Sequence, residues 1–208
     1  MIRCSLLLAL FSFLLFACDT KEGSQATLRI NIEKPPETLD PREARDIRTF
    51  NILKMLFEGL TREAPDGSIE LALAEKIESS AQHTTFTFHL RESKWSNGLP
   101  LTAEDFVYAW TSLLSPDFPA PYANLLYCIK NAQAIKTGKK PLNELGLKVL
   151  TSHSFEVTME TPTPYFIKLI STPPFFPVPA NEFKPIPQNF ISNGPFTLRS
   201  YEEFDFGM

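Results

Sequence analysis

Apolar and polar residues alternate along the stretch from Thr85 to Leu90, and a period of two is typical of a strand with one buried face. A polar turn follows at 96–98, where Gly98 can supply the positive φ that a tight turn requires. From Phe106 to Leu114 the apolar residues recur at helical spacing, after a candidate N-cap residue, Thr102. This stretch therefore predicts a strand, a turn and a capped amphipathic helix.

The rest of the hydrophobic pattern predicts further short elements, separated by proline and glycine punctuation. We expect a strand at 27–32, a helix at 51–60, a hairpin at 61–74 that turns at 65–67, a hairpin at 145–158, a short helix at 166–170 and an extended crossing over the prolines at 173–179. Strands and helices of this kind, interleaved along one chain, predict a mixed α/β fold.

Composition narrows the class of protein. The chain has 208 residues, 43% of them hydrophobic, which is enough for a substantial core. The formal net charge is −4 and the basic residues are scattered, so we expect no nucleic-acid binding. The 18 prolines against 8 glycines indicate rigid connections between short elements.

The first residues have the layout of an export signal. Arg3 precedes an apolar run from Leu6 to Ala17, and a run of about a dozen residues is too short to span a membrane, which takes about 20. The run ends in the letters LFAC at 15–18, which resemble a bacterial lipobox and imply cleavage before Cys18 and lipidation of Cys18. We expect a lipoprotein signal peptide at 1–17 and a polar tether at 18–26, so that the mature chain is lipid-anchored and extracytoplasmic, in the periplasm or on the outer face of the cell membrane. The alternative is an ordinary signal peptide with an incidental cysteine.

No residue pattern indicates catalysis or metal binding. The three histidines, His83, His89 and His153, lie far apart and match no metal-ligand spacing. The sequence holds no motif of serine hydrolases, zinc proteases or nucleotide-binding loops. If Cys18 is lipidated, Cys128 is the single cysteine left in the mature chain, and no internal disulfide can form. We therefore expect neither an enzyme nor a metal or cofactor site.

The stretch from Trp95 to Trp110 reads W-S-N-G-x-P-x-T-A-x-D-F-x-x-x-W. It resembles the motif of the extracytoplasmic solute-binding proteins of family 5 that serve oligopeptide ABC importers. Three further stretches resemble the same family, namely TLDP at 38–41, NILKMLFEGL at 51–60 and SNGPF at 192–196. Within the motif we interpret Trp95, Asn97, Gly98, Asp105 and Trp110 as structural residues.

The resemblance implies a clamshell fold similar to the type II periplasmic binding proteins. Residues 27–57 and 180–208 would then belong to a partial lobe I, and residues 58–179 would form lobe II. Members of this family are typically more than twice as long as this chain. The resemblance therefore also implies a chain that is truncated before the C-terminal lobe.

The function implied by the resemblance is that of a peptide-binding lipoprotein subunit of an oligopeptide ABC importer, which captures extended peptides through backbone contacts between lobes. Its partners would be oligopeptides, the ABC permease and ATPase subunits and, through the lipid, the membrane. The ligand contacts carried over are Arg45, Asp46 and Ile47, just after the Leu-Asp-Pro step, and Tyr122. Two alternatives stay open, because Arg45 could be a solvated surface residue and Tyr122 could pack under a loop.

Two other functions also stay open. The chain could be a truncated surface lipoprotein that acts as an interaction module without peptide capture. It could also serve another ligand, such as a haem or a metal chelate, although no residue supports that hypothesis. Calorimetry with mixed tri- to pentapeptides separates the first alternative from peptide capture.

Overall fold

The computed structural model describes residues 27–32, 34–180, 183 and 189–200. It divides into two units, residues 1–34 and 35–208. In the first unit the predicted strand at 27–32 is wrong, because these residues have no strand geometry and Leu28 and Ile30 are 56% and 49% exposed. Neither sheet of the described structure includes this stretch, and alternation alone does not make a strand without a neighbouring strand to pair with. The predicted signal peptide, lipidation site and tether lie outside the described residues.

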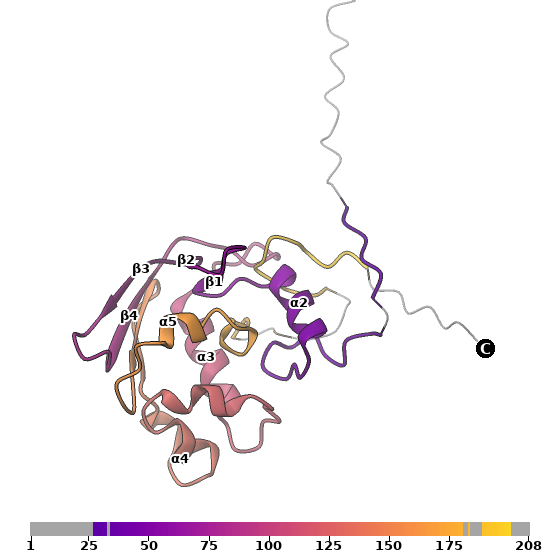
Figure 1. Cartoon of the computed structure of the whole chain (residues 1–208). Coiled ribbons are helices and arrows are strands. Elements are labelled where there is room, and N and C mark those ends of the chain that lie inside the picture. Colours follow the sequence, from indigo (N-terminus) through magenta and orange to yellow (C-terminus); the bar gives the residue numbers. More distant parts are fainter. Residues whose placement is uncertain (1–26, 33, 181–182, 184–188, 201–208) are drawn as a thin grey trace, which may run out of the picture. The chain divides into compact units, whose positions relative to one another are not determined.

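The second unit contains a four-stranded antiparallel sheet with the order β3-β4-β6-β5 (Figure 1). Its strands are β3 (Ala74–Ser79), β4 (Thr85–Leu90), β5 (Leu147–Thr151) and β6 (Ser154–Thr158). In the middle of the sheet, Phe88 of β4 is paired with Phe155 of β6. Every second residue of β4 is buried, as the alternation predicts, because one face of the sheet packs on the core.

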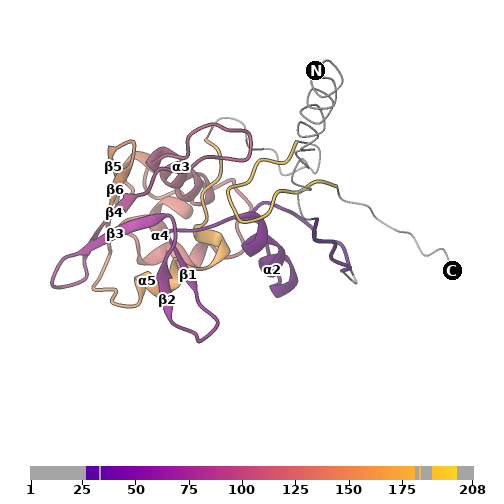
Figure 2. The same ribbon diagram turned by 90° about the horizontal axis from the view of Figure 1, so that it is seen from above.

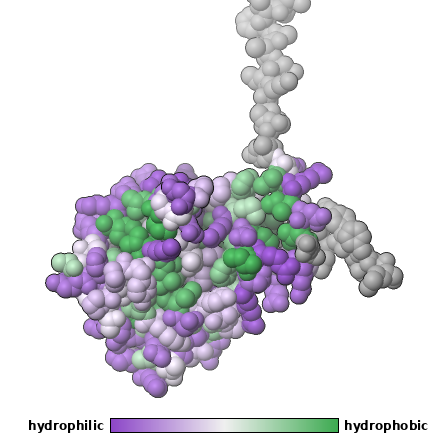
Figure 3. Space-filling view, viewed as in Figure 1, coloured by the Kyte–Doolittle hydropathy of each residue, from purple (hydrophilic) through white to green (hydrophobic). Residues whose placement is uncertain are grey.

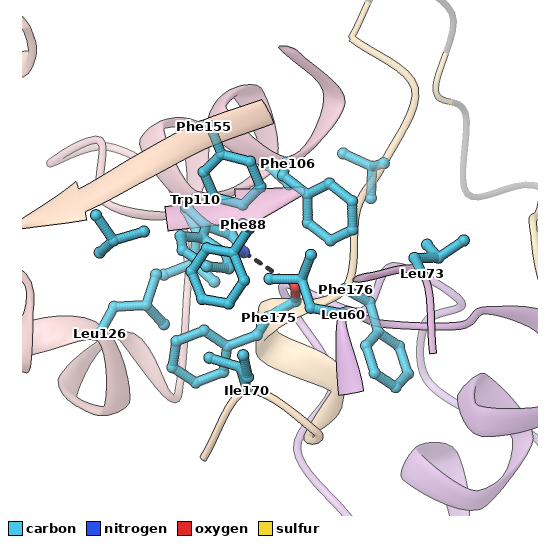
Figure 4. Close-up of a cluster of buried hydrophobic side chains, with 14 of the residues drawn as sticks. Leu60, Leu73, Phe88, Phe106, Trp110, Leu126, Phe155, Ile170, Phe175 and Phe176 are labelled. Atoms are coloured by element: carbon cyan, nitrogen blue, oxygen red, sulfur yellow. Dashed lines mark hydrogen bonds between the residues drawn. The ribbon is translucent and has the colours of Figure 1, made fainter. Parts of the chain in front are cut away.

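The helix α3 (Ala103–Leu113) packs against this sheet, with the Phe106 and Phe155 rings stacked 5.6 Å apart between centroids. Trp110 is fully buried among the rings of Phe155, Phe166 and Phe175. Its indole Nε1 donates a hydrogen bond of 3.0 Å to the Phe175 carbonyl oxygen, the dashed line in Figure 4. Because the indole N–H has an acceptor, the largest side chain of the core is buried without an unpaired polar group.

The remaining elements lie next to the sheet and α3 (Figure 2). They are α2 (Ile47–Leu56), the separate hairpin of β1 (Thr61–Glu63) and β2 (Ile69–Leu71), the 3₁₀ helix η1 (Ala123–Cys128), α4 (Ala132–Lys136), η2 (Leu142–Glu144), α5 (Phe166–Leu169) and η3 (Pro173–Phe175). The described elements confirm a mixed α/β composition.

Several local predictions are confirmed. The two predicted hairpins form β1–β2 and β5–β6, and the predicted strand and helix around the turn at 96–98 are β4 and α3. Gly67 and Gly98 adopt φ values of +82° and +87° in their turns, a region in which a side chain is strained.

Two predicted elements have different bounds in the structure. The helix expected at 51–60 is α2, which begins at Ile47 after its N-cap Asp46 and ends at Leu56, because Phe57 takes an extended conformation with φ −126°. Leu60 is buried although it lies outside the helix. The proline stretch begins with the 3₁₀ turn η3 rather than an extended crossing, since proline is compatible with the first helical position.

Within the part of the chain that the structure describes, no helix has the length and hydropathy that a membrane span requires. Figure 3 shows hydrophobic side chains interspersed with hydrophilic ones on the face in view. Among the exposed large hydrophobic residues are Leu71, Leu99 and Tyr165, which belong to different elements or loops. Scattered residues of this kind are normal on a protein surface.

Candidate ligand-binding site

The loop before α2 is fixed by a buried ion pair. Asp40 and Arg42 are 2% and 8% exposed, and Arg42 Nη2 lies 2.7 Å from Asp40 Oδ2 while Arg42 Nε donates to Asp40 Oδ1 at 3.0 Å. The remaining nitrogen, Arg42 Nη1, donates a hydrogen bond of 2.7 Å to Ser112 Oγ on α3. One guanidinium therefore joins the loop to a helix 70 residues further along the chain.

Aromatic rings enclose the same guanidinium. The Arg42 Cζ atom lies 4.7 Å from the ring centroid of Phe118, 5.5 Å from that of Phe183 and 5.9 Å from that of Tyr108. Burial alone would lower the pKa of Arg42, but the hydrogen bond and the negative charge of Asp40 outweigh it and raise the pKa above its usual value. The loop thus holds a permanent positive charge that is compensated locally.

The structure brings together Arg45, Asp46, Ile47 and Tyr122, the four residues that the sequence analysis predicts as ligand contacts. The Tyr122 hydroxyl donates a hydrogen bond of 3.0 Å to the Arg45 carbonyl oxygen. Its ring packs against Phe50 of α2, with centroids 5.5 Å apart. The packing is the alternative role foreseen for Tyr122, and a ligand contact by this residue stays a prediction.

Asp46 has a definite local role as the N-cap of α2. Its carboxylate accepts hydrogen bonds from the backbone N–H groups of Arg48 at 3.0 Å and Thr49 at 3.1 Å, and from the Thr49 hydroxyl at 2.7 Å. These bonds, led by that of the Thr49 hydroxyl, lower the pKa of Asp46. The carboxylate is therefore committed to the helix end.

The two neighbours of Asp46 present their side chains to solvent. Ile47 is 70% exposed and Arg45 is also exposed, while the backbone of Asp46 is extended, with φ −132° and ψ 158°. The site thus combines an extended backbone at Asp46, a fixed carbonyl at Arg45 and exposed side chains at Arg45 and Ile47.

Arg42 is a residue of the site that was not predicted from the sequence pattern. The local signal was present, because an arginine two residues after Asp40 in the Leu-Asp-Pro step can pair with that carboxylate. The other partner, Ser112, is too distant in sequence for any local pattern to indicate it. Only the folded chain shows that the ion pair also contacts α3.

Two of the motif residues, Trp95 and Asp105, contact each other directly. The Asp105 Oδ2 atom accepts hydrogen bonds from Trp95 Nε1 at 3.1 Å and from the Thr102 backbone N–H at 2.9 Å. Its Oδ1 atom accepts from the Ala180 backbone N–H at 3.0 Å. The carboxylate is buried and has several hydrogen-bond donors, which is an arrangement for holding α3, the preceding turn and the later segment in register.

The described residues offer little other chemistry. No group of three or more His, Cys, Asp or Glu side chains among them could hold a metal ion. Burial raises the pKa of the Cys128 thiol to about 11, so this cysteine is protonated at neutral pH and is a poor nucleophile. The predicted lipidation site, Cys18, lies outside the described part of the chain.

Residues 68–205 match the family described as bacterial extracellular solute-binding proteins, family 5, middle part. That match covers more than half of the chain. The chain belongs to this family. Family 5 proteins bind solutes and are not enzymes, so the expectation of a non-catalytic protein is confirmed.

Individual family 5 relatives resemble most of this chain. The oligopeptide-binding protein OppA of Bacillus subtilis is 37% identical over 215 residues, covering 94% of this chain and 39% of the relative. The probable deoxycholate-binding periplasmic protein YgiS of Escherichia coli is 36% identical over 197 residues, covering 88% and 37%. The structure of Haemophilus influenzae OppA in complex with the peptide RPPGFSPFR matches with a TM-score of 0.77 and 34% identity, over 80% of this chain and 34% of that one.

The comparisons also show how much of its relatives this family 5 chain spans and how varied their named solutes are. The chain spans less than two fifths of the length of these relatives. Its relatives include proteins named for chemically different solutes, since one is named for oligopeptides and another for deoxycholate. The fold match to part of an OppA structure is consistent with the predicted binding-protein fold.

Proposed function

We propose that this chain is a peptide-binding lipoprotein component of an oligopeptide ABC importer and that it contributes the first side of the ligand site. An extended peptide would lie along the segment from Arg45 to Ile47 and contact Tyr122. Main-chain pairing would provide most of the affinity, which suits a receptor for peptides of varied sequence. The clamshell arrangement, with lobe I at 27–57 and 180–208 and lobe II at 58–179, belongs to this proposal.

The observation that carries the proposal is the extended backbone at Asp46 beside the Arg45 carbonyl that Tyr122 fixes. The Tyr122 hydroxyl holds the Arg45 carbonyl, and the Asp46 side chain is occupied by α2. Extended segments recognise other extended segments through backbone hydrogen bonds. A segment that is already ordered loses little conformational entropy when a ligand pairs with it.

The membrane part of the proposal concerns residues outside the described structure. Lipid on Cys18 would anchor the protein on the outer side of the membrane, where it would deliver the ligand to the permease, and the ATPase subunits would supply the energy for transport. Acyl chains stabilise membrane attachment by about 0.8 kcal/mol per buried CH₂ group. Metabolic labelling with radioactive palmitate should mark the wild-type protein and leave a Cys18→Ala variant unlabelled, and an unlabelled wild type would refute the anchor.

Ligand capture is tested by isothermal titration calorimetry of the purified chain with mixed tri- to pentapeptides, and with deoxycholate as a chemically different solute. We expect saturable peptide binding that is weaker for Tyr122→Phe, because that change removes the hydroxyl but keeps the ring. Tyr165→Phe is the matched control, since Tyr165 is 61% exposed at the start of α5.

Each result of this titration has a separate meaning. Absence of peptide heat from a folded wild-type protein would overturn the proposal and favour an interaction module without peptide capture. Binding of deoxycholate alone would replace the proposed ligand class. An equal effect of the Tyr122 and Tyr165 changes would remove Tyr122 from the site while leaving the function in place.

A further inference from the structure

We propose that Arg42 is a positioning residue for ligand capture: it holds the segment from Glu43 to Ile47 against α3 without contacting the ligand itself. This inference rests on the proposed function for its connection to ligand, although its structural part can be tested separately. Three observations support it, namely the geometry of the guanidinium, its burial and the chain distance to the site.

The geometry is specific to arginine. The Nε and Nη2 atoms of Arg42 face Asp40, and Nη1 faces Ser112 Oγ at 2.7 Å. A guanidinium offers donors in a rigid planar fork, whereas a lysine ammonium is a single point charge. Arg42 can therefore bond the carboxylate of its own loop and the hydroxyl of α3 at the same time.

Burial makes the arrangement stiff. Asp40 and Arg42 are almost fully buried and three aromatic rings surround the guanidinium. An ion pair in such surroundings is weakly screened, and a charge that loses its partner there is strongly unfavourable. The loop consequently has one low-energy position relative to α3, and the hydrogen bond from Arg42 to Ser112 determines that position.

Arg42 lies close to the candidate site along the chain, so its position affects the site directly. Only Glu43 and Ala44 separate Arg42 from Arg45, and Ala44 is itself 1% exposed. On the far side, the Arg45 carbonyl is held by Tyr122 and Asp46 caps α2. A shift of Arg42 must therefore displace the Arg45 backbone or break one of these hydrogen bonds.

The test uses changes at Ser112, because removing the Arg42 charge would leave Asp40 buried without a partner and could unfold the protein. Ser112→Ala removes the acceptor on α3 and keeps the ion pair. Ser112→Thr retains the hydroxyl. Thr111→Ala, one position earlier on the same helix, is the control. Arg42→Lys is a second variant that keeps the charge and removes the fork.

Two measurements are made on each folded variant, namely amide hydrogen exchange at 43–47 and peptide affinity by calorimetry. We expect Ser112→Ala to speed exchange at 43–47 and to raise the peptide Kd about fivefold, a size typical of losing one ordinary hydrogen bond. Arg42→Lys should have a larger effect in the same direction. Ser112→Thr and Thr111→Ala should match the wild type in both measurements.

The outcomes separate this inference from the proposed function. Unchanged exchange and Kd in Ser112→Ala and Arg42→Lys would overturn the positioning role while peptide binding stands. Failure of Ser112→Thr to restore both measurements would also overturn it, because the hydroxyl would not be the contact that matters. If the wild type binds no peptide, the proposed function fails. In that case, faster exchange confined to 43–47 in Ser112→Ala would still support the structural role of Arg42, and unchanged exchange would refute it.

Discussion

The charged side chain of Arg45 is exposed to solvent. The charge of Arg42, in contrast, is buried and compensated by Asp40. The Arg45 carbonyl is fixed by Tyr122, so the start of its side chain has a definite place at the candidate site. An exposed charge at such a place adds little affinity but discriminates between ligands of opposite charge. We therefore propose, as part of the proposed function, that Arg45 contributes to ligand selectivity.

Arg45→Glu should reverse a preference for acidic over basic peptides of equal length. At low ionic strength we expect the ratio of the two Kd values to change by about three- to tenfold, and the change should shrink in high salt because exposed charges are screened. Competition titrations at two salt concentrations measure this ratio. Lys54→Glu, which makes the same charge change near the other end of α2, is the control, and an equal effect of both variants would contradict the prediction.

At the core, Trp110 combines large volume with a satisfied polar group. Trp110→Phe should destabilise the fold by about 2–4 kcal/mol, because it opens a cavity and leaves the Phe175 carbonyl without its indole donor. Denaturant unfolding followed by far-UV circular dichroism measures the loss. Tyr165→Phe, at an exposed site, should change the free energy of unfolding by less than about 0.5 kcal/mol. A Trp110→Phe cost as small as that of Tyr165→Phe would show that the core repacks around this position.

Among the elements, α2 depends on its N-cap. Asp46→Ala should cost about 1 kcal/mol at neutral pH, since it removes acceptors for two backbone N–H groups at the helix start. The pKa of Asp46 is lowered by folding, so the stability that its carboxylate contributes is present above the ordinary carboxyl pKa and is lost as pH falls through the lowered one.

The gap in unfolding free energy between wild type and Asp46→Ala should therefore narrow in acid below the ordinary value of 3.8. Denaturant melts of both proteins at neutral and acidic pH measure the gap. Asp46→Asn keeps an acceptor without a titrating proton, and its stability relative to Asp46→Ala should vary much less with pH. A constant gap between wild type and Asp46→Ala would mean that the charge of Asp46 has no part in capping.

The segment that follows Phe190 packs tightly on the end of α2. The Gly194 backbone N–H donates to the Leu56 carbonyl oxygen at 2.8 Å, and a Cβ atom at Gly194 would lie 2.5 Å from the Leu56 carbonyl carbon. Asn193 adds two side-chain hydrogen bonds to the backbone of Glu58. This close approach explains a glycine at 194 better than turn geometry does, because its φ is not positive.

Gly194→Ala should destabilise the protein by about 1–3 kcal/mol, the usual cost of forcing an extra group against backbone. Thr197→Ala, on the exposed stretch that follows, should be neutral within about 0.5 kcal/mol. Chemical unfolding of both variants provides the comparison. Equal stabilities would imply that the segment at 190–196 separates from α2 without loss.

Elements specified by neighbouring residues could be predicted from the sequence. The alternation in β4 and the glycine turns at Gly67 and Gly98 are local and were predicted correctly. The strand at 27–32 had the same alternation, but alternation describes one face only and does not supply a partner strand. At the site, the four predicted contacts do lie together, whereas the bond between Arg42 and Ser112 spans 70 residues and has no local signal.

At the scale of the whole molecule, one hydrophobic core crosses the predicted boundaries between lobes. Phe57 and Phe190 of the predicted lobe I belong to the same buried cluster as Trp110 of the predicted lobe II. The Ser96 backbone N–H of lobe II donates to the Ser192 carbonyl oxygen of lobe I at 2.8 Å. The Ala180 backbone N–H of lobe I donates to Asp105 Oδ1 of lobe II at 3.0 Å. The two predicted lobes therefore describe how a ligand would be bound. The contacts between described residues of 35–200 indicate that the two predicted lobes fold together.

We therefore expect residues 35–200 to unfold in a single cooperative transition. Both tryptophans, Trp95 and Trp110, are buried within the predicted lobe II, so their fluorescence follows that part of the chain. Hydrogen exchange of the α2 amides as a function of denaturant follows the predicted lobe I. Because Phe57 and Phe190 pack in the same core as Trp110, the α2 amides and the tryptophan signal should yield the same free energy and the same denaturant dependence. A lower opening free energy for the amides of α2, with fluorescence unchanged, would show that the predicted lobe I segments fold separately and would contradict a common core.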